Sequence, residues 1–274
     1  MSTGVVMMMG SHPRHFAVAR SLKEGGHLRA MVVEQREDFV PEPDPSWDPH
    51  YQELFRLHFE KRRLAEKEAF GGIDPEEICR GIPCLRSSRE ELNSEKVLGF
   101  LRKHQSPMLV SYGVHRLSPD VISLFPEKAF NIHGGLSPWF RGNTTLFWPF
   151  YFLKPNYAGM TIHRLSERLD GGDILHHSLP ELRRGDGIHD VASRAVLQVA
   201  EDLGKILARL DQGTELKCVP QKSPGKLFVT SDWTPQTLTV IYDLFGDRIV
   251  DRFLDGTLIR DDPEVVDFFR NCPE

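Results

Sequence analysis

Residues 129–143 read AFNIHGGLSPWFRGN, a short apolar run that ends in two polar side chains and a sharp turn. Side chains alternate between the two faces of a strand, so Asn131 and His133 share one face while Phe130 and Ile132 share the other. The two glycines that follow accept backbone angles that other residues resist. The stretch therefore predicts the end of a buried strand, with an amide and an imidazole directed at a site beside the turn.

An amide and an imidazole directed at one point can donate hydrogen bonds to a developing oxyanion, and a histidine can move a proton near neutral pH. The alternative is that Asn131 and His133 only cap the strand. Chemistry is favoured by Asp170, which precedes two glycines in the loop of SERLDGGDILHH at 166–177. A carboxylate beside the imidazole would raise the pKa of His133, favour its cation and accept a proton. The rival Asp173 begins the next strand and is better placed to anchor the loop.

The sequence near these residues offers no nucleophilic serine or cysteine. Ser137 follows closely but precedes Pro138, and the strand-turn-helix pattern G-x-S-x-G is absent. Asn131, His133 and Asp170 together therefore indicate direct acyl transfer or hydrolysis, with no covalent intermediate on the enzyme.

The chain opens with a β-α-β pattern. Residues 5–9 are an apolar run closed by Gly10, residues 13–23 carry an apolar stripe at helical spacing, and residues 28–34 are a second apolar run. This order predicts a parallel sheet covered by helices. The remaining expected elements are strands at 82–88, 107–113, 128–133, 158–165 and 173–179, and helices at 51–70, 88–103 and 187–210.

Two domains are predicted. Residues 1–212 form the α/β catalytic domain, and the texture changes from Lys217 onward, so residues 213–274 are expected to form a small C-terminal α+β subdomain. A chain of 274 residues with 40% hydrophobic composition is long enough to bury a large core.

The formal net charge of −5 makes the chain a poor candidate for non-specific nucleic-acid binding. In the run EKRR at 60–63, the basic residues are surrounded by Glu60, Glu66 and Glu68. This mixture of charges favours a solvated helix face. Four scattered cysteines, Cys79, Cys84, Cys218 and Cys272, lack zinc-site spacing, so we expect reduced thiols and no metal.

The N-terminus lacks a basic start, and its apolar run at 5–9 is too short for a signal peptide. The most apolar window, 145–153, is far below the ~20 residues that span a membrane. We therefore expect a cytoplasmic protein that does not contact a membrane.

Three motifs occur in an order and spacing similar to those of the formyltransferase family, which includes glycinamide ribonucleotide transformylase, methionyl-tRNA formyltransferase and the sugar N-formyltransferases. They are SYGVHRLSPDVI at 111–122, NIHGGLSPWFRG at 131–142 and GMTIHRLSERLDGGDIL at 159–175. The family signature is Asn-x-His, then Ser-Leu-Leu-Pro, then Leu-Asp-x-Gly. The resemblance is strong over 107–177 and extends from 5 to about 210. It departs at 134–138, where the usual PSLLP reads GGLSP.

The resemblance implies a Rossmann-like fold, a mostly parallel sheet with helices on both faces, that binds N10-formyltetrahydrofolate at the carboxyl ends of its strands. It implies that His133 stabilises the oxyanion with Asn131 as second donor. It also implies that Asp170 holds His133 in its charged form and helps to remove the proton of the attacking amine.

Apart from the resemblance, Arg141 is a candidate contact for an anionic acceptor, with Gly142 and Asn143 beside it. The resemblance implies where the folate binds. The pterin would lie against the loop that follows the strand at 107–113 and the loop before Asp170. The folate-binding residues implied are Tyr112, Gly113, Val114, His115, Arg116, Leu117, Leu165 and Leu169.

The acceptor is narrowed by elimination within the family. The tail from Lys217 is short and acidic, which argues against tRNA, and the loop GSHP at 10–13 is a poor phosphate cradle for glycinamide ribonucleotide. Formyltetrahydrofolate hydrolases usually begin with a regulatory domain that this sequence lacks. The remaining activity within the family is N-formylation of a small amine, and the commonest such amine is a nucleotide-linked amino sugar. The aromatic residues of 147–151 either stack on the acceptor or belong to the core.

Several alternatives stay open at this point: another small amine or methionyl-tRNA as acceptor, water as acceptor, and a non-catalytic binding module. A homodimer is also left open. A dinucleotide-binding oxidoreductase is discounted because Gly10 is not followed by glycines at the spacing of that fingerprint.

Overall fold

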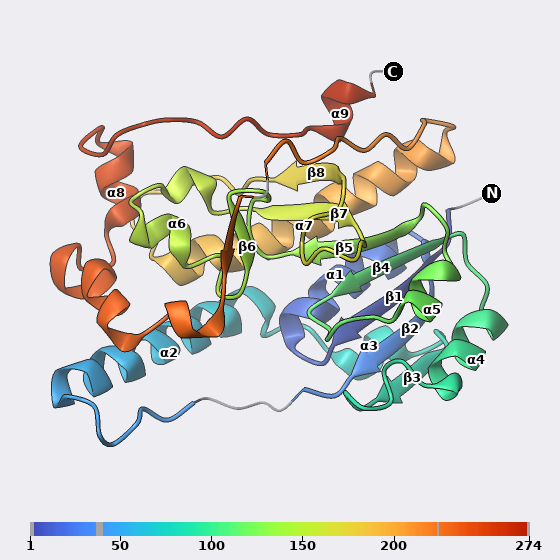
Figure 1. The fold of residues 1–274 in the computed structure, drawn as a ribbon, viewed down its shortest axis with the longest axis horizontal. Helices are drawn as coiled ribbons and strands as arrows, with labels where there is room; N and C mark the ends of the chain where they lie inside the picture. Colours follow the sequence, from blue (N-terminus) through green and yellow to red (C-terminus); the bar gives the residue numbers. More distant parts are fainter. Residues whose placement is uncertain (1–2, 37–40, 224, 273–274) are drawn as a thin grey trace.

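A seven-stranded sheet in the order β3-β2-β1-β4-β5-β7-β8 organises the molecule. The structure is a computed structural model that describes residues 3–36, 41–223 and 225–272. Strands β3 to β5 are parallel, and β7 runs antiparallel to both of its neighbours. The expected α/β fold with a mostly parallel sheet is confirmed (Figure 1). The strands are β1 Val5–Gly10, β2 Leu28–Glu34, β3 Cys84–Ser87, β4 Met108–Tyr112, β5 Ala129–His133, β7 Met160–Arg164 and β8 Ile174–Ser178.

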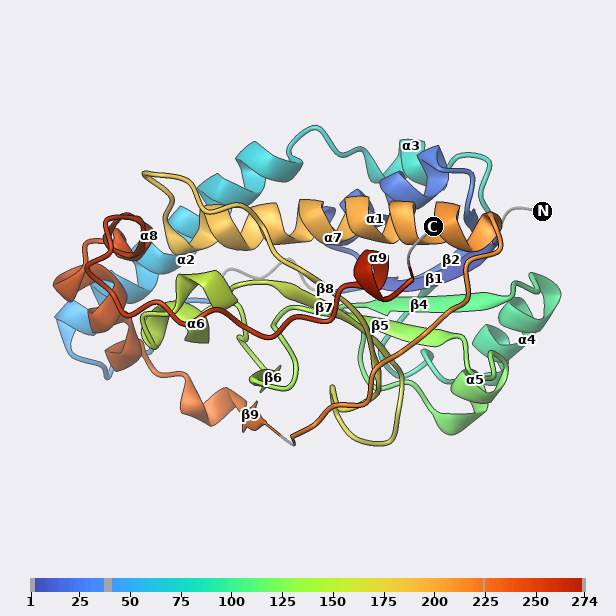
Figure 2. The same ribbon diagram turned by 90° about the horizontal axis from the view of Figure 1, so that it is seen from above.

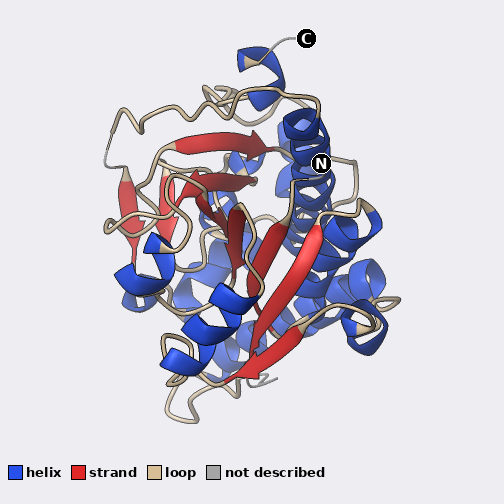
Figure 3. Cartoon of the chain, turned by 90° about the vertical axis from the view of Figure 1, so that its right-hand side faces the viewer, coloured by secondary structure: helices blue, strands red, loops and turns tan. Residues whose placement is uncertain are grey.

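Helices cover both faces of this sheet, as Figures 2 and 3 show. The α-helices are α1 Pro13–Glu24, α2 Pro49–Phe70, α3 Pro75–Cys79, α4 Glu95–Lys103, α5 Pro119–Ser123, α6 Trp148–Tyr151, α7 Ile188–Asp211, α8 Ile249–Leu254 and α9 Phe268–Asn271. Short 3-10 turns lie at Pro155–Tyr157, Thr230–Asp232 and Pro235–Thr237, and a π-helical turn lies at Val240–Leu244.

The alternation of β1 divides the core between the two faces. Met7 and Met9 pack with α1 and α7 on one face, whereas Val6 and Met8 pack with α4 and α5 on the other. All four side chains are fully buried. Because a strand buried on both faces needs apolar residues at every position, the run VVMMM marks the centre of a covered parallel sheet.

The helix expected at 88–103 begins later than the sequence indicated. Ser94 is the residue before its first turn, and α4 starts at Glu95. Residues 89–93 form turns that bury Leu92 in the core, with the amide of Ser94 bonded to the carbonyl of Glu91. The acidic residues at 90 and 91 therefore precede the helix instead of opening it.

The segment after α7 packs onto the first 212 residues. Strand β9, Lys226–Phe228, pairs in parallel with β6, Phe140–Gly142, in a second, two-stranded sheet. The ring of Phe228 stacks on Trp148 with centroids 4.6 Å apart. A second hydrophobic cluster unites this aromatic region with buried residues of the tail such as Leu238 and Ile241. The division into domains at 212/213 stays a prediction.

Within the described ranges, none of the helices is both long enough and apolar enough to cross a membrane.

Candidate active site

A cleft of about 480 Å³ opens where the carboxyl ends of β1, β4 and β5 meet. The chain leaves β1 toward β2 on one side, whereas β4 and β5 extend the sheet on the other, so this edge is a topological switch point. Ligands of open α/β sheets bind at such points. The lining residues include His15 after β1, Tyr112 and Gly113 at the end of β4, and His133 and Gly134 at the end of β5.

His133 has an oxygen atom beside each of its two ring nitrogens. Its Nε2 lies 2.8 Å from the carbonyl oxygen of Phe140, and because a carbonyl only accepts, Nε2 carries the proton. Its Nδ1 lies 3.5 Å from Oδ2 of Asp170. The expectation that this carboxylate keeps the imidazole charged is wrong. Burial lowers the pKa of His133 and outweighs the opposing effect of Asp170, so the resting ring is neutral at neutral pH.

Asp170 is buried in a turn with a left-handed backbone, φ 48°. Its Oδ2 accepts a hydrogen bond of 2.9 Å from the amide of Gly142. Burial alone would raise the pKa of Asp170, but the neighbouring rings of His163 and His133 and this amide together lower it to about 2. Asp170 is therefore a fixed negative charge at neutral pH. The turn allows no side chain at Gly172, where a Cβ would lie 2.0 Å from the carbonyl oxygen of Arg164.

The amide of Asn131 has a defined orientation. Its Oδ1 accepts a hydrogen bond of 2.8 Å from the hydroxyl of Ser111, and its Nδ2 lies 3.3 Å from Nε2 of His163. The Nδ1 of His163 lies 2.8 Å from the carbonyl of Arg164 and so donates to it. An amide nitrogen only donates, so Nε2 is the acceptor in its contact with Asn131. One hydrogen of the Asn131 amide is thereby engaged, and the second is left as a donor.

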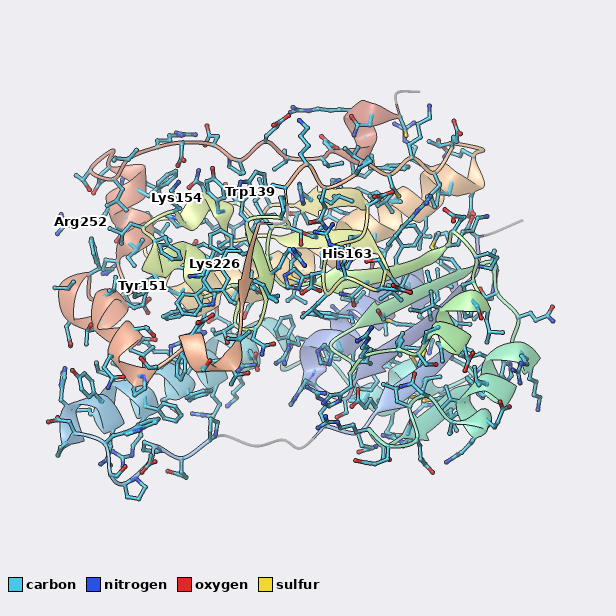
Figure 4. All side chains as sticks on the ribbon, viewed as in Figure 1. Trp139, Tyr151, Lys154, His163, Lys226 and Arg252 are labelled. Atoms are coloured by element: carbon cyan, nitrogen blue, oxygen red, sulfur yellow. The ribbon has the colours of Figure 1, made fainter. Side chains whose placement is uncertain are left out.

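His163 is a further residue of the site that was not predicted from the sequence. It lies on β7 (Figure 4). It is directly opposite Asn131 in the β5–β7 ladder, and its Nε2 is 3.6 Å from Oδ1 of Asp170. In the sequence, His163 stands out only as a histidine within the mostly apolar run GMTIHRL at 159–165. That signal becomes meaningful only once β7 is known to pair with β5. The structure thus brings together Asn131, His133, Asp170 and His163 from three segments.

Two side chains hold the turn that carries Asp170. Arg141, predicted as a substrate contact, is buried, and its Nε donates to the carbonyl of Leu169 at 3.0 Å. Gln221 from the C-terminal segment donates to the carbonyls of Asp170 and Gly172, both at 2.8 Å. Gly142 and Asn143 line the cleft, whereas Arg141 is not among the lining residues. A role for these residues in binding the acceptor stays a prediction.

The loop after β4 is anchored by polar contacts to its neighbours. The amide of His115 donates to Oε2 of Glu34 at 2.9 Å, and the ring of His115 also contacts that carboxylate. Asn93 donates to the carbonyl of Arg116 at 3.0 Å, and Leu117 is buried.

Leu169, in contrast, is 59% exposed beside the buried Asp170. Of the other residues predicted to bind folate, Tyr112 and Gly113 line the cleft, and Val114 and Leu165 pack against the core cluster that contains Leu117. Their binding role stays a prediction. Among the described residues, no group of three or more His, Cys, Asp and Glu side chains could hold a metal ion.

Helix α2 corrects the reading of EKRR as a solvated face. Arg63 is exposed and pairs with Glu60, as that reading requires. Its neighbour Arg62 instead lines the cleft, together with Glu66. Adjacent helical residues point about 100° apart, so a basic run spreads over different environments. The sequence could not show which of its members faces the cleft.

The geometry can be compared with known proteins. The sequence model described as "Formyl transferase" matches residues 60–203, more than half of the chain, and this match contains His133 and Asp170. The chain belongs to the formyltransferase family. The resemblance first seen in three motifs is thereby confirmed.

A curated relative, the methionyl-tRNA formyltransferase of Anaeromyxobacter sp. (strain K), is 31% identical over 135 residues, which are 49% of this chain and 42% of that enzyme. The chain thus matches less than half the length of this relative. A second curated relative, the methionyl-tRNA formyltransferase of Anaeromyxobacter dehalogenans (strain 2CP-C), is 34% identical over 106 residues. These are 39% of this chain and 33% of that enzyme.

Solved structures of this family share the fold. The phosphoribosylglycinamide formyltransferase of Anaplasma phagocytophilum superposes with a TM-score of 0.53 at 18% identity, covering 84% of this chain and all of that one. The formyltransferase PseJ of Anoxybacillus kamchatkensis, solved with UDP-4,6-dideoxy-4-formamido-L-AltNAc and tetrahydrofolate, covers 90% of this chain and 96% of that chain, with 16% identity and a TM-score of 0.50.

Proposed function

We propose that this formyltransferase moves a formyl group from N10-formyltetrahydrofolate to the primary amine of a small molecule, most readily a nucleotide-linked amino sugar. The observation that carries the proposal is the convergence of Asn131, His133 and Asp170 beside a cleft at the switch point of a formyltransferase sheet. These groups come from the end of β5 and from the loop that follows β7, and a role confined to capping a strand would not require them to meet.

The folate supplies an activated formyl carbon, and each residue has a defined task toward it. The amine attacks the formyl carbon, neutral His133 accepts at Nδ1 the proton that the amine loses, and Asp170 stabilises the imidazolium so formed. The carbon–N10 bond then breaks, and this proton goes to N10 of the leaving tetrahydrofolate. The free amide hydrogen of Asn131 donates to the negative charge that develops on the formyl oxygen, and the positive charge of the imidazolium stabilises it further. A ring that is neutral at rest is suited to this sequence, because it can accept a proton before it donates one.

The described residues fit a folate beside the Asp170 turn. The exposed side chain of Leu169 offers an apolar surface next to the catalytic carboxylate, and the loop after β4 is fixed by Glu34 and Asn93. We propose that the pterin lies between these two loops, against Leu165 and Leu117 and the main chain of residues 113–116.

Two features support a small nucleotide-linked acceptor. PseJ, of the same fold, was solved with a UDP-linked formamido sugar. In this chain, Phe147 both belongs to the second hydrophobic cluster and lines the cleft, so it is able to contact a sugar or a base. The competing acceptor is methionyl-tRNA, which the matching region of the curated relatives suggests. A chain with a net charge of −5 is poorly suited to tRNA.

The test is consumption of N10-formyltetrahydrofolate with a panel of nucleotide-linked amino sugars, with methionyl-tRNA and with no amine. We expect turnover with at least one amino sugar, and His133→Ala should lower kcat by at least about 10²-fold because the proton acceptor is lost, and with it the positive charge that stabilises the oxyanion. His104→Ala, outside the cleft, is the control. A loss below tenfold would contradict the role of His133, and turnover without any amine would identify a hydrolase instead.

A further inference from the structure

One face of α2 forms a wall of the cleft. His58, Arg62, Glu66 and Phe70 all line it, and they follow one another at intervals of four residues. Residues spaced by four lie above one another on a helix, so these side chains form a single row. Helix α2 lies on the same side of the sheet as α1 and α7 (Figure 2). The chain thus places a complete helix face against the site that contains His133.

The centre of this row is a fixed cluster of charges. Oε1 of Glu66 lies 3.0 Å from Nη1 of Arg14 on α1 and 3.0 Å from Nε of Arg62 on α2. Burial alone would raise the pKa of Glu66, but the two guanidinium groups outweigh it and lower the pKa. Glu66 therefore stays ionised and holds the two arginines side by side. A guanidinium has five N–H donors, so each arginine can bind Glu66 and still donate to a ligand.

The charge of the cleft differs from that of the whole chain. In the described part of the chain, its ionised lining residues are Arg14, Arg36 and Arg62 against Glu66, whereas the chain carries −5. The lining histidines add little to this positive charge, because burial lowers the pKa of His15, His58, His133 and His189. Such a local excess of positive charge, in a cleft with apolar walls, concentrates anions.

A second feature indicates that a ligand completes this cleft. Nε2 of His189, a lining residue at the start of α7, is buried and has no hydrogen-bond partner among the described residues. Buried polar atoms are nearly always paired in folded proteins, so an unpaired nitrogen on the wall of a cleft is a site for a ligand hydrogen-bond donor.

We propose that Arg14 and Arg62, clamped by Glu66, form the subsite that binds a phosphoryl group of the amine acceptor. This inference rests on the proposed function for the identity of the acceptor, but the binding step is independent of it. A guanidinium matches the oxygens of a phosphoryl group bidentately, and two of them fixed by one carboxylate are preorganised for it. The loop at 10–13 lacks a glycine-rich cradle, so these side chains do the work of recognition.

Binding of inorganic pyrophosphate, UDP and uridine to the whole chain, measured by calorimetry, tests the subsite without any formyl transfer. We expect pyrophosphate and UDP to bind, uridine to bind at least tenfold more weakly than UDP, and the affinity for UDP to fall as salt is raised. Arg62→Gln should weaken UDP binding about ten- to hundredfold, the loss typical of a hydrogen bond to a charged group. Arg62→Lys should lose less, because the charge is kept.

The matched control is Arg63→Gln, which changes the next residue, an exposed arginine paired with Glu60. It should bind UDP like the unaltered chain, and circular dichroism checks that both variants fold. Equal losses in Arg62→Gln and Arg63→Gln, or no binding of pyrophosphate and UDP at millimolar concentration, would overturn the proposal. If UDP binds as expected but no amine is formylated, the proposed function fails while the subsite stands.

With an active acceptor in hand, a steady-state measurement separates recognition from chemistry. Arg62→Gln should raise the KM for the acceptor at least tenfold and leave the KM for the folate unchanged. A change confined to kcat would contradict a binding role for Arg62.

Discussion

Burial and charge act in opposite directions on the pKa of His133. Its ring is buried, which disfavours the cation, while Asp170 lies 3.5 Å from its Nδ1 and favours it. Burial has the larger effect, so the pKa lies below its ordinary value of 6.5. A carboxylate next to a histidine therefore does not by itself imply a charged imidazole. Asp170 instead lowers the free-energy cost of protonating the His133 ring, which is neutral at rest.

This balance predicts the titration of the ring. By NMR, His133 should titrate below 6.5 in the unaltered chain and lower still in Asp170→Asn, because the variant removes the charge that favours the cation. His50, whose pKa is raised by Asp243, is the internal control and should not move. The same variant should lower kcat by about 10²- to 10⁴-fold, the range of general acid–base catalysis. A titration of His133 above 6.5 would show that charge outweighs burial.

At the scale of elements, the C-terminal segment supports the catalytic turn. Gln221 donates to the carbonyls of Asp170 and Gly172, and β9 pairs with β6, whose last residue, Gly142, donates its amide to Asp170. The tail therefore contacts the turn of Asp170 in two ways, directly through Gln221 and indirectly through the pairing of β9 with β6. Its contribution to the site is one of position, since Gln221 does not touch the cleft.

Removal of this support should loosen the turn. Gln221→Ala leaves two carbonyls of the turn without their donor, at a cost of about 1–3 kcal/mol for buried groups. We expect kcat to fall about tenfold or more with the acceptor KM nearly unchanged, and the NMR titration of His133 to shift downward as Asp170 becomes less fixed. Lys222→Ala, an exposed neighbour paired with Glu264, is the control. An unchanged kcat in Gln221→Ala would remove the tail from the catalytic argument.

At the scale of the whole molecule, the buried histidines couple stability to pH. Burial lowers the pKa of five of them, to about 3 for His58 and about 4 for His177. A histidine with a lowered folded pKa is protonated first in the unfolded chain. Its stability contribution is therefore lost as pH falls below the unfolded pKa of 6.5, until the folded pKa is reached. The full set is His15, His58, His133, His177 and His189.

Denaturant unfolding across pH tests this coupling. The free energy of unfolding should fall by at least about 3 kcal/mol between about pH 7 and pH 5, since each proton taken up on unfolding costs roughly 1.4 kcal/mol per pH unit. His58→Phe should reduce the slope by about one proton. Asp170 acts in a different window, because its lowered pKa affects stability only between 3.8 and about 2. A loss below about 1 kcal/mol would contradict the assignment of these rings as neutral.

The sequence predicted the fold where its signals are local. The apolar runs, the β-α-β opening and the long helix α7 follow from periodicity and from glycine and proline punctuation, which act between residues close in the chain. The start of α4 was missed because Ser87 and Ser88 resemble helix caps, whereas the burial of Leu92 delays the helix to Glu95.

By itself, the sequence determined that Asn131 and His133 share a strand face, because alternation along a strand depends only on the chain, and its motifs named Asp170 as their partner. Only the tertiary structure decided that His163 lies opposite Asn131, that Arg62 and not Arg63 faces the cleft, and that the ring of His133 is neutral. The reason is physical: pairing across a sheet and the desolvation of an imidazole depend on which distant segments come together, and no local spacing encodes that.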